Sequence, residues 1–296
     1  MKNGTIFTGA ATALITPLTA EGVDYEAYGK LIDWQIEEGI DALVVAATTG
    51  EGSTLSDVEH KAVVRYAVEK VAGRVPVIAG TGSNDTAYGV QLTQAACEDG
   101  VDACLIVTPY YNKVTQKGLV KMYQEYSDAS SVPIIVYNVP SRTGVNIQPA
   151  TYAQLAEIEN IAAIKEANND IASITETMSL VQGKMDLYSG NDDQIVPLLA
   201  TGGIGVISVL SNVAPRATHD MVMKFMEGDV AGACEMQLKY RNLVKELFCE
   251  VNPIPVKAAC AAMGLCENYV RAPLYTMEPE NEERLLASMR NVGLID

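Results

Sequence analysis

The chain has 296 residues, of which 48% are hydrophobic, and its formal net charge is −16 at pH 7. This length fits one large α/β barrel with an appendage, or two ordinary domains, and the apolar fraction excludes a disordered chain. The negative charge disfavours binding to nucleic acid or to an anionic membrane surface. No apolar run approaches the roughly 20 residues that span a bilayer, so we expect no membrane segment.

The N-terminal stretch "MKNGTIFTGAATALITPL" contains a single lysine, Lys2, and an early Gly4. Because this composition makes a poor signal peptide, we expect a first strand within residues 9–18 and a cytoplasmic protein. The six cysteines form no CxxC pair and are expected to be buried free thiols in a reducing compartment. The only histidines, His60 and His219, are interpreted as helix-face residues, so we expect no bound metal.

Eight short apolar runs recur along the chain, each nearly continuous rather than alternating. This pattern is typical of parallel strands that are covered on both faces. The runs span residues 12–18, 42–50, 75–82, 103–111, 132–140, 161–167, 186–192 and 203–210. Helical segments are predicted between them at 25–39, 56–73, 86–100, 116–130 and 148–160.

The repeated strand–helix unit predicts a (β/α)8 barrel, a TIM barrel, over residues 1–225. The remaining chain has helical patterns at 214–229, 230–250, 253–265 and 281–293. The first of these helices would close the barrel. The others predict a C-terminal helical domain over residues 226–296, in which the Met- and Leu-rich faces form core or subunit contacts.

Active sites of such barrels lie at the C-terminal ends of the strands. In this sequence the strand ends carry a polar, hydroxyl-rich set with few carboxylates: Thr48, Thr49, Tyr110, Tyr111, Tyr137, Arg142, Lys165 and Gly190.

Lys165 lies within the otherwise apolar run "IAAIKEA". One interpretation is a lysine that extends to solvent, or that pairs with Glu166 or another buried acid. The alternative, which we favour, is a lysine that forms a Schiff base, because desolvation lowers the pKa of an amine and yields a neutral nucleophile.

Attack of an amine on a carbonyl needs proton delivery and removal, and Thr49, Tyr111 and Tyr137 are candidates for such a relay. For two further features the residues leave both interpretations open. Arg142 is a surface charge or a bidentate carboxylate clamp. The Thr48–Thr49–Gly50 turn either binds a carboxylate or serves ordinary loop and helix-capping chemistry.

Taken together, these motifs resemble the dihydrodipicolinate synthase family, which belongs to the pyruvate-dependent class I aldolase superfamily that includes N-acetylneuraminate lyase. The resemblance runs over essentially the whole chain. It rests on "TTGE", "VTPYYN", "YNVPSRTG", "IKEA", "SGND" and "GGIGVISV". The combination is highly specific, although no single motif would be.

The resemblance implies a Schiff base between Lys165 and pyruvate, with no other cofactor. Tyr137, Thr49 and Tyr111 would form the proton relay, with Tyr111 provided by a neighbouring subunit of a homotetramer built as a dimer of dimers. The Thr48–Thr49 turn would hold the pyruvate carboxylate. Gly190 and Ile207 would line the pocket, and Arg142 would hold the carboxylate of L-aspartate 4-semialdehyde. The product would be 4-hydroxy-tetrahydrodipicolinate, on the route to diaminopimelate and lysine.

The sequence departs from the family pattern in two places. Ala47 stands where the family usually has glycine before the two threonines, which puts the position of that loop in question. The second departure concerns the site for feedback inhibition by lysine, where sensitive members carry a glutamate in place of Tyr88. The matching positions are Gly52, Ser53, Asp57, His60, Asn84, Tyr88 and Tyr110. We therefore expect weak or absent inhibition by L-lysine.

Two other functions remain as alternatives at this point. The chain could be a related aldolase for sugar acids of the N-acetylneuraminate or keto-deoxy-gluconate type, although Arg142 and the double tyrosine disfavour it. It could also be a barrel that binds a keto acid without catalysis, which the set of lysine, tyrosine and threonine disfavours. Turnover of aspartate semialdehyde against sugar acids, and trapping of a pyruvate adduct with borohydride, distinguish these functions.

Overall fold

A computed structural model describes residues 4–296 of the chain, so Lys2 lies outside the described residues. Eight parallel strands form a closed barrel in the order β1-β10-β9-β8-β7-β6-β5-β4. Their bounds are β1 Gly9–Ala13, β4 Ala42–Val45, β5 Val77–Gly80, β6 Ala103–Val107, β7 Ile134–Asn138, β8 Ile161–Glu166, β9 Asp186–Ser189 and β10 Gly205–Ser208. The predicted (β/α)8 barrel is therefore confirmed.

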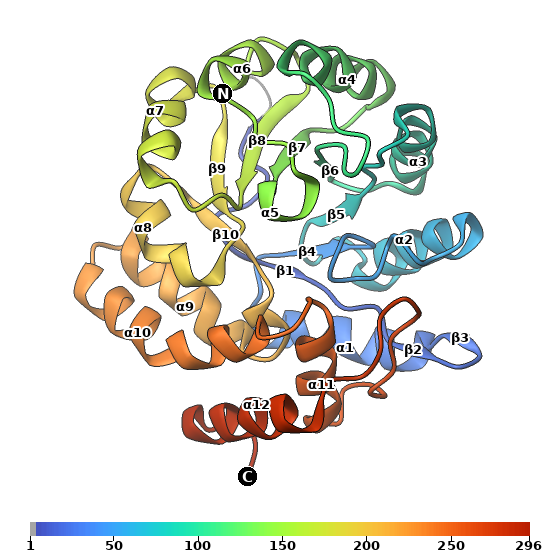
Figure 1. The fold of residues 1–296 in the computed structure, drawn as a ribbon, viewed down its shortest axis with the longest axis vertical. Coiled ribbons are helices and arrows are strands. Elements are labelled where there is room, and N and C mark those ends of the chain that lie inside the picture. Colours follow the sequence, from blue (N-terminus) through green and yellow to red (C-terminus); the bar gives the residue numbers. More distant parts are fainter. Residues whose placement is uncertain (1–3) are drawn as a thin grey trace.

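Helices surround this barrel as an outer ring (Figure 1). They are α1 Tyr25–Glu37, α2 Asp57–Val71, α3 Thr86–Asp99, α4 Gln116–Ala129, α6 Pro149–Leu155, α7 Ile171–Val181, α8 Ile195–Ala200 and α9 Pro215–Met226. Local sequence sets several of their ends. At the start of α2, for example, the Ser56 side chain accepts from the Glu59 N–H and the Glu59 side chain accepts from the Ser56 N–H. This reciprocal capping explains why that boundary was predictable.

Several elements were not predicted from the sequence. They are α7, α8, the short helix α5 (Pro140–Thr143), the hairpin of β2 (Leu18–Thr19) and β3 (Gly22–Val23), and the 3-10 turns η1 (Asp192–Gln194) and η2 (Leu210–Asn212). The sequence of α7, "IASITETMSLV", is rich in Ile, Ser and Thr, which have modest helix propensity. Its Asp170 cap and the burial of Ile174, Met178 and Val181 stabilise it instead.

The interior of the barrel is filled mainly by small and branched apolar side chains, together with two tyrosines. Tyr188 on β9 donates from its hydroxyl to the backbone carbonyl of Phe7 at 2.8 Å. Its ring also stacks on the Phe7 ring with centroids 4.2 Å apart. Tyr137, the second tyrosine, lies at the carboxyl end of β7 and is available to the site there.

The C-terminal helices are α10 (Val230–Leu247), α11 (Ile254–Ala262) and α12 (Pro279–Val292). In the view of Figure 1, α10 lies beside α9, whereas α11 and α12 lie below α1. Lys257 of α11 is fully buried, and its Nζ lies 2.8 Å from Glu51 Oε1 and 2.7 Å from the carbonyl of Thr16. These helices therefore contact the carboxyl end of the barrel directly. The division of the chain at residue 225 stays a prediction. Among the described residues, no helix has the length and apolar character needed to cross a membrane.

Candidate active site

Lys165 and Tyr137 lie side by side inside the barrel because β8 and β7 are paired in register at these two residues. Lys165 Nζ lies 4.3 Å from the centroid of the Tyr137 ring. Both residues are almost completely buried, at 6% and 7% exposure. The amine thus lies over an aromatic ring and is largely removed from water.

Burial is the main cause that lowers the pKa of Lys165 from 10.5 to about 7, and the positive charge of Arg142 lowers it further. The carboxylate of Asp192 acts in the opposite direction and raises it. Burial also raises the pKa of the Tyr137 phenol to about 12, so the phenol keeps its proton at neutral pH. The pair therefore combines an amine that is substantially neutral with a protonated donor beside it.

This lowered pKa predicts how covalent capture of a keto acid depends on pH. Only the neutral amine is nucleophilic, so the rate of borohydride-trapped adduct formation should rise with pH up to about 7 and level off above it. An ordinary lysine would still show a rising rate well above that value, because most of it is protonated below its pKa. Mass spectrometry of the pyruvate adduct across this range measures the profile.

Asp192 offers a matched variant for this experiment. Since its carboxylate raises the pKa of Lys165, Asp192→Asn should shift the rise in rate toward lower pH. An unchanged profile in the variant, or a profile in the original chain that still climbs far above pH 7, would contradict the assignment.

The neighbouring carboxylate of Glu166 does not pair with Lys165. Successive residues of a strand point to opposite faces, and Glu166 points outward from the barrel. There it accepts from Tyr152 Oη, Asn138 Nδ2 and the Asn168 N–H, each at 2.9 Å. The structure thus disfavours the interpretation of Lys165 as the partner of Glu166.

A cavity of about 380 Å³ brings several predicted residues together at this end of the barrel. Thr48, Tyr137 and Arg142 line it, together with five positions of the predicted lysine site: Gly52, Ser53, His60, Tyr88 and Tyr110. The two remaining positions are not part of its lining. Asp57 pairs with Lys61 at 3.0 Å, and the Asn84 carbonyl accepts from Asn112 Nδ2 at 2.8 Å.

The two threonines of the turn after β4 have different surroundings. Thr48 is exposed and faces the cavity, whereas Thr49 is 3% exposed and accepts a hydrogen bond from Asn252 Nδ2 at 2.9 Å. Thr16 Oγ1 fixes the middle of the turn by donating to the Gly50 carbonyl at 2.7 Å. The geometry therefore favours Thr48 over Thr49 as the hydroxyl next to Tyr137.

Ala47 fits this loop without backbone strain. It is not among the residues with positive φ, whereas its neighbour Ala46 has φ of 52°. A Cβ on Gly80 would come within 2.6 Å of the Ala47 Cα and 2.8 Å of its Cβ, so β5 approaches this loop too closely for any residue but glycine at position 80.

Tyr111 does not reach the site of its own chain. Its side chain is 91% exposed, and its backbone has φ of 69°, in the left-handed region that non-glycine residues rarely adopt. Gly190 and Ile207 do lie near the lysine strand. The Gly190 N–H donates to the Glu166 carbonyl at 2.7 Å, and Ile207 is in the same interior cluster as Tyr137.

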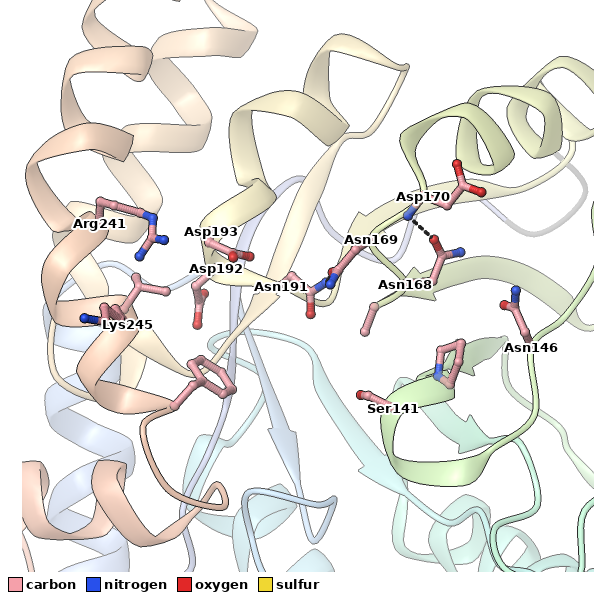
Figure 2. Close-up of a pocket in the computed structure, with 14 residues that line it drawn as sticks. Ser141, Asn146, Asn168, Asn169, Asp170, Asn191, Asp192, Asp193, Arg241 and Lys245 are labelled. Carbon is pink, nitrogen blue, oxygen red and sulfur yellow. Dashed lines mark hydrogen bonds between the residues drawn. The ribbon is translucent and has the colours of Figure 1, made fainter. Parts of the chain in front are cut away.

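A second cavity, of about 950 Å³, opens between α10 and the loops that follow β7, β8 and β9. Figure 2 shows Arg241 and Lys245 extending from α10 on one side, with Asn168 and Asn146 on the opposite side. Asp192 lies between them. Its Oδ2 accepts from the N–H groups of Val209 and Leu210 at 2.9 Å, while its Oδ1 is buried without a hydrogen-bond partner among the described residues.

The sequence analysis did not identify three residues at this end of the barrel: Asp192, Asn252 and Lys257. Asp192 ends the motif "SGND" and could have been noticed as an acid directly after a barrel strand. Asn252 and Lys257 lie in the C-terminal segment, and no local pattern connects them with the barrel. Only their contacts with Thr49 and Glu51 identify them.

Comparisons with known proteins point to one family. A sequence profile of the Dihydrodipicolinate synthetase family matches residues 6–291. The 4-hydroxy-tetrahydrodipicolinate synthase of Acetivibrio thermocellus is 53% identical over 290 residues, which cover 98% of this chain and 99% of the relative.

Solved structures resemble the chain over the same length. The dihydrodipicolinate synthase of Acinetobacter baumannii, crystallised with pyruvate, has a TM-score of 0.96 at 41% identity and covers 98% of this chain and 100% of its own. The enzyme of Cyanidioschyzon merolae, with lysine bound, has a TM-score of 0.95 at 35% identity and covers 99% of this chain and 100% of its own. These matches confirm the predicted synthase, an enzyme of the lyase class, and the chain belongs to the dihydrodipicolinate synthetase family.

Proposed function

We propose that this chain condenses pyruvate with L-aspartate 4-semialdehyde through a Schiff base on Lys165 and forms 4-hydroxy-tetrahydrodipicolinate for the diaminopimelate and lysine pathway. The observation that carries the proposal is a buried lysine with a pKa of about 7, in contact with a tyrosine at the carboxyl end of a barrel. The pyruvate complex of the Acinetobacter baumannii relative supports pyruvate as the first substrate.

In the first half of the reaction, the neutral amine of Lys165 attacks the keto carbon of pyruvate. The carbinolamine loses water after a proton reaches its oxygen, for which the protonated Tyr137 phenol is placed beside the amine. The Thr48–Thr49 turn would hold the pyruvate carboxylate, with Gly190 and Ile207 lining the pocket. No metal or organic cofactor is needed, since the iminium itself withdraws electrons.

In the second half, loss of a methyl proton gives an enamine, whose carbon attacks the aldehyde of the second substrate, and the aldehyde oxygen takes up a proton. Arg142, exposed at the cavity, would bind the carboxylate of that substrate. The product's amino group then displaces Lys165 at the iminium carbon, which closes the ring and frees the lysine.

The proton relay requires a second copy of the chain. We propose that Tyr111, which is 91% exposed, completes the site of a neighbouring subunit in a homotetramer arranged as a dimer of dimers. The strained φ of 69° at this residue supports a functional role for its position. The enzyme would act in the cytoplasm.

Removal of one hydroxyl tests the relay. Tyr137→Phe keeps the ring against the Lys165 amine but removes the acid, so kcat should fall by about 10²–10³-fold with little change in KM. Steady-state kinetics with both substrates measure this split. Tyr188→Phe, which removes another buried phenol of the barrel interior, is the matched control and should lower thermal stability without lowering kcat. A Tyr137→Phe enzyme with full kcat would remove Tyr137 from the mechanism.

The same assay distinguishes the two threonines. If Thr48 is the relay hydroxyl, Thr48→Val should lower kcat, whereas Thr49→Val should act mainly on the KM for pyruvate. If instead Thr49→Val lowers kcat and Thr48→Val raises the KM for pyruvate, Thr49 is the relay hydroxyl, as the sequence resemblance implied.

Inhibition by L-lysine should be weak or absent. Tyr88, where sensitive members carry a glutamate, presents a phenol to the 380 Å³ cavity and has no carboxylate for the inhibitor's amine. Titration of the initial rate with L-lysine measures this, and Tyr88→Glu should increase the sensitivity. Inhibition of the unaltered chain at micromolar lysine would contradict the expectation.

A further inference from the structure

The loop between α10 and α11 contributes a residue that contacts both proposed carboxylate sites. Asn252 is 5% exposed. Its Nδ2 donates to Thr49 Oγ1 at 2.9 Å. Its backbone carbonyl accepts from Arg142 Nη2 at 3.1 Å. One residue of the C-terminal segment therefore joins the turn after β4 to the arginine of α5.

The Asn252 amide also fixes the role of the Thr49 hydroxyl oxygen as a hydrogen-bond acceptor. A hydroxyl oxygen that accepts an N–H must direct its own proton to another acceptor. The amide oxygen Oδ1, in contrast, is buried and has no hydrogen-bond partner among the described residues. The side chain therefore makes its hydrogen bond through Nδ2, on the side of Thr49.

The same turn is held a second time from the C-terminal segment. Lys257 of α11 pairs with Glu51 at 2.8 Å and also donates to the Thr16 carbonyl. Glu51 has φ of 54°, a left-handed conformation that surrounding contacts must maintain in a non-glycine residue. Two residues of the Thr48–Glu51 turn, Thr49 and Glu51, are thus bound to residues that follow the barrel in the chain.

We propose that Asn252 is a positioning residue that joins the turn binding the pyruvate carboxylate to the arginine binding the second carboxylate. This inference rests on the proposed function of both groups. Asn252 does not react itself. Its side chain positions Thr49, its backbone positions Arg142, and the C-terminal segment is therefore part of the active site rather than an accessory to it.

Kinetics of Asn252→Ala test the side-chain contact. The variant keeps the backbone carbonyl, so the KM for pyruvate should rise about tenfold while the KM for aspartate semialdehyde changes much less. Asn252→Asp is nearly isosteric but accepts where the amide donates, and should impair pyruvate binding at least as much. Asn281→Ala is the matched control, because Asn281 lies in the same segment and donates to Glu250, away from the turn. It should affect thermal stability only.

A double-mutant cycle shows whether Asn252 acts through Thr49. Asn252→Ala and Thr49→Val should each lower kcat/KM for pyruvate, and the double variant should lose little more than the larger single effect. Additive losses, or an Asn252→Ala enzyme whose only change is a lower melting temperature, would overturn the proposal. Failure of the proposed function itself looks different: the unaltered chain would then form no borohydride-trapped adduct on Lys165.

Discussion

Lys165→Ala should abolish synthase turnover, with a loss of at least about a thousandfold, because the variant lacks the amine that attacks the keto acid in the proposed mechanism. No pyruvate adduct should be detected by mass spectrometry after borohydride. The length-matched Lys165→Met should behave in the same way, since it fills the same space inside the barrel but carries no amine. Its melting temperature should be unchanged or higher, because a desolvated amine is removed from the barrel.

Lys184→Ala is the control for this experiment. Lys184 lies on the surface, where it pairs with Glu157 at 2.5 Å, and its loss should leave turnover and the adduct intact. An adduct that persists in Lys165→Met at the level of the original chain would show that another amine captures pyruvate. The mechanism proposed above would then be wrong.

Lys257→Met should destabilise the protein by about 3–5 kcal/mol, the largest stability effect that we expect. The substitution leaves Glu51 with an uncompensated charge at 2% exposure and removes a donor from the Thr16 carbonyl. Unfolding by urea, followed by circular dichroism and by tryptophan fluorescence, measures the change. Because the pair supports the turn after β4, pyruvate binding should weaken as well.

Two further variants separate the charge from the packing at this position. Replacing both members, Glu51→Leu with Lys257→Met, should recover part of the lost stability, since no charge is then left unpaired. Lys224→Met, which breaks the exposed pair with Asp229, should change stability little. A Lys257→Met protein as stable as the original would contradict the importance of the buried pair.

The sequence was sufficient for features that have a local origin. The barrel follows from eight apolar runs of strand length, and the boundary of α2 follows from Ser56 and Glu59, because both patterns depend on residues close together in the chain. Lys165 was identifiable for a similar reason, since a lysine within an apolar run stands out without any knowledge of its neighbours. The helix α7 was missed because it is rich in Ile, Ser and Thr, whose helix propensity is modest, and packing stabilises it.

The tertiary structure decided which polar groups meet at the site and which way they face. Whether Thr48 or Thr49 faces the cavity depends on a contact between Thr49 and Asn252, which are 203 residues apart in the chain. The buried pair of Glu51 and Lys257 likewise joins the barrel to the C-terminal helices. Periodicity and local motifs cannot reveal such contacts, because they arise only when the barrel closes and α11 packs against its carboxyl end.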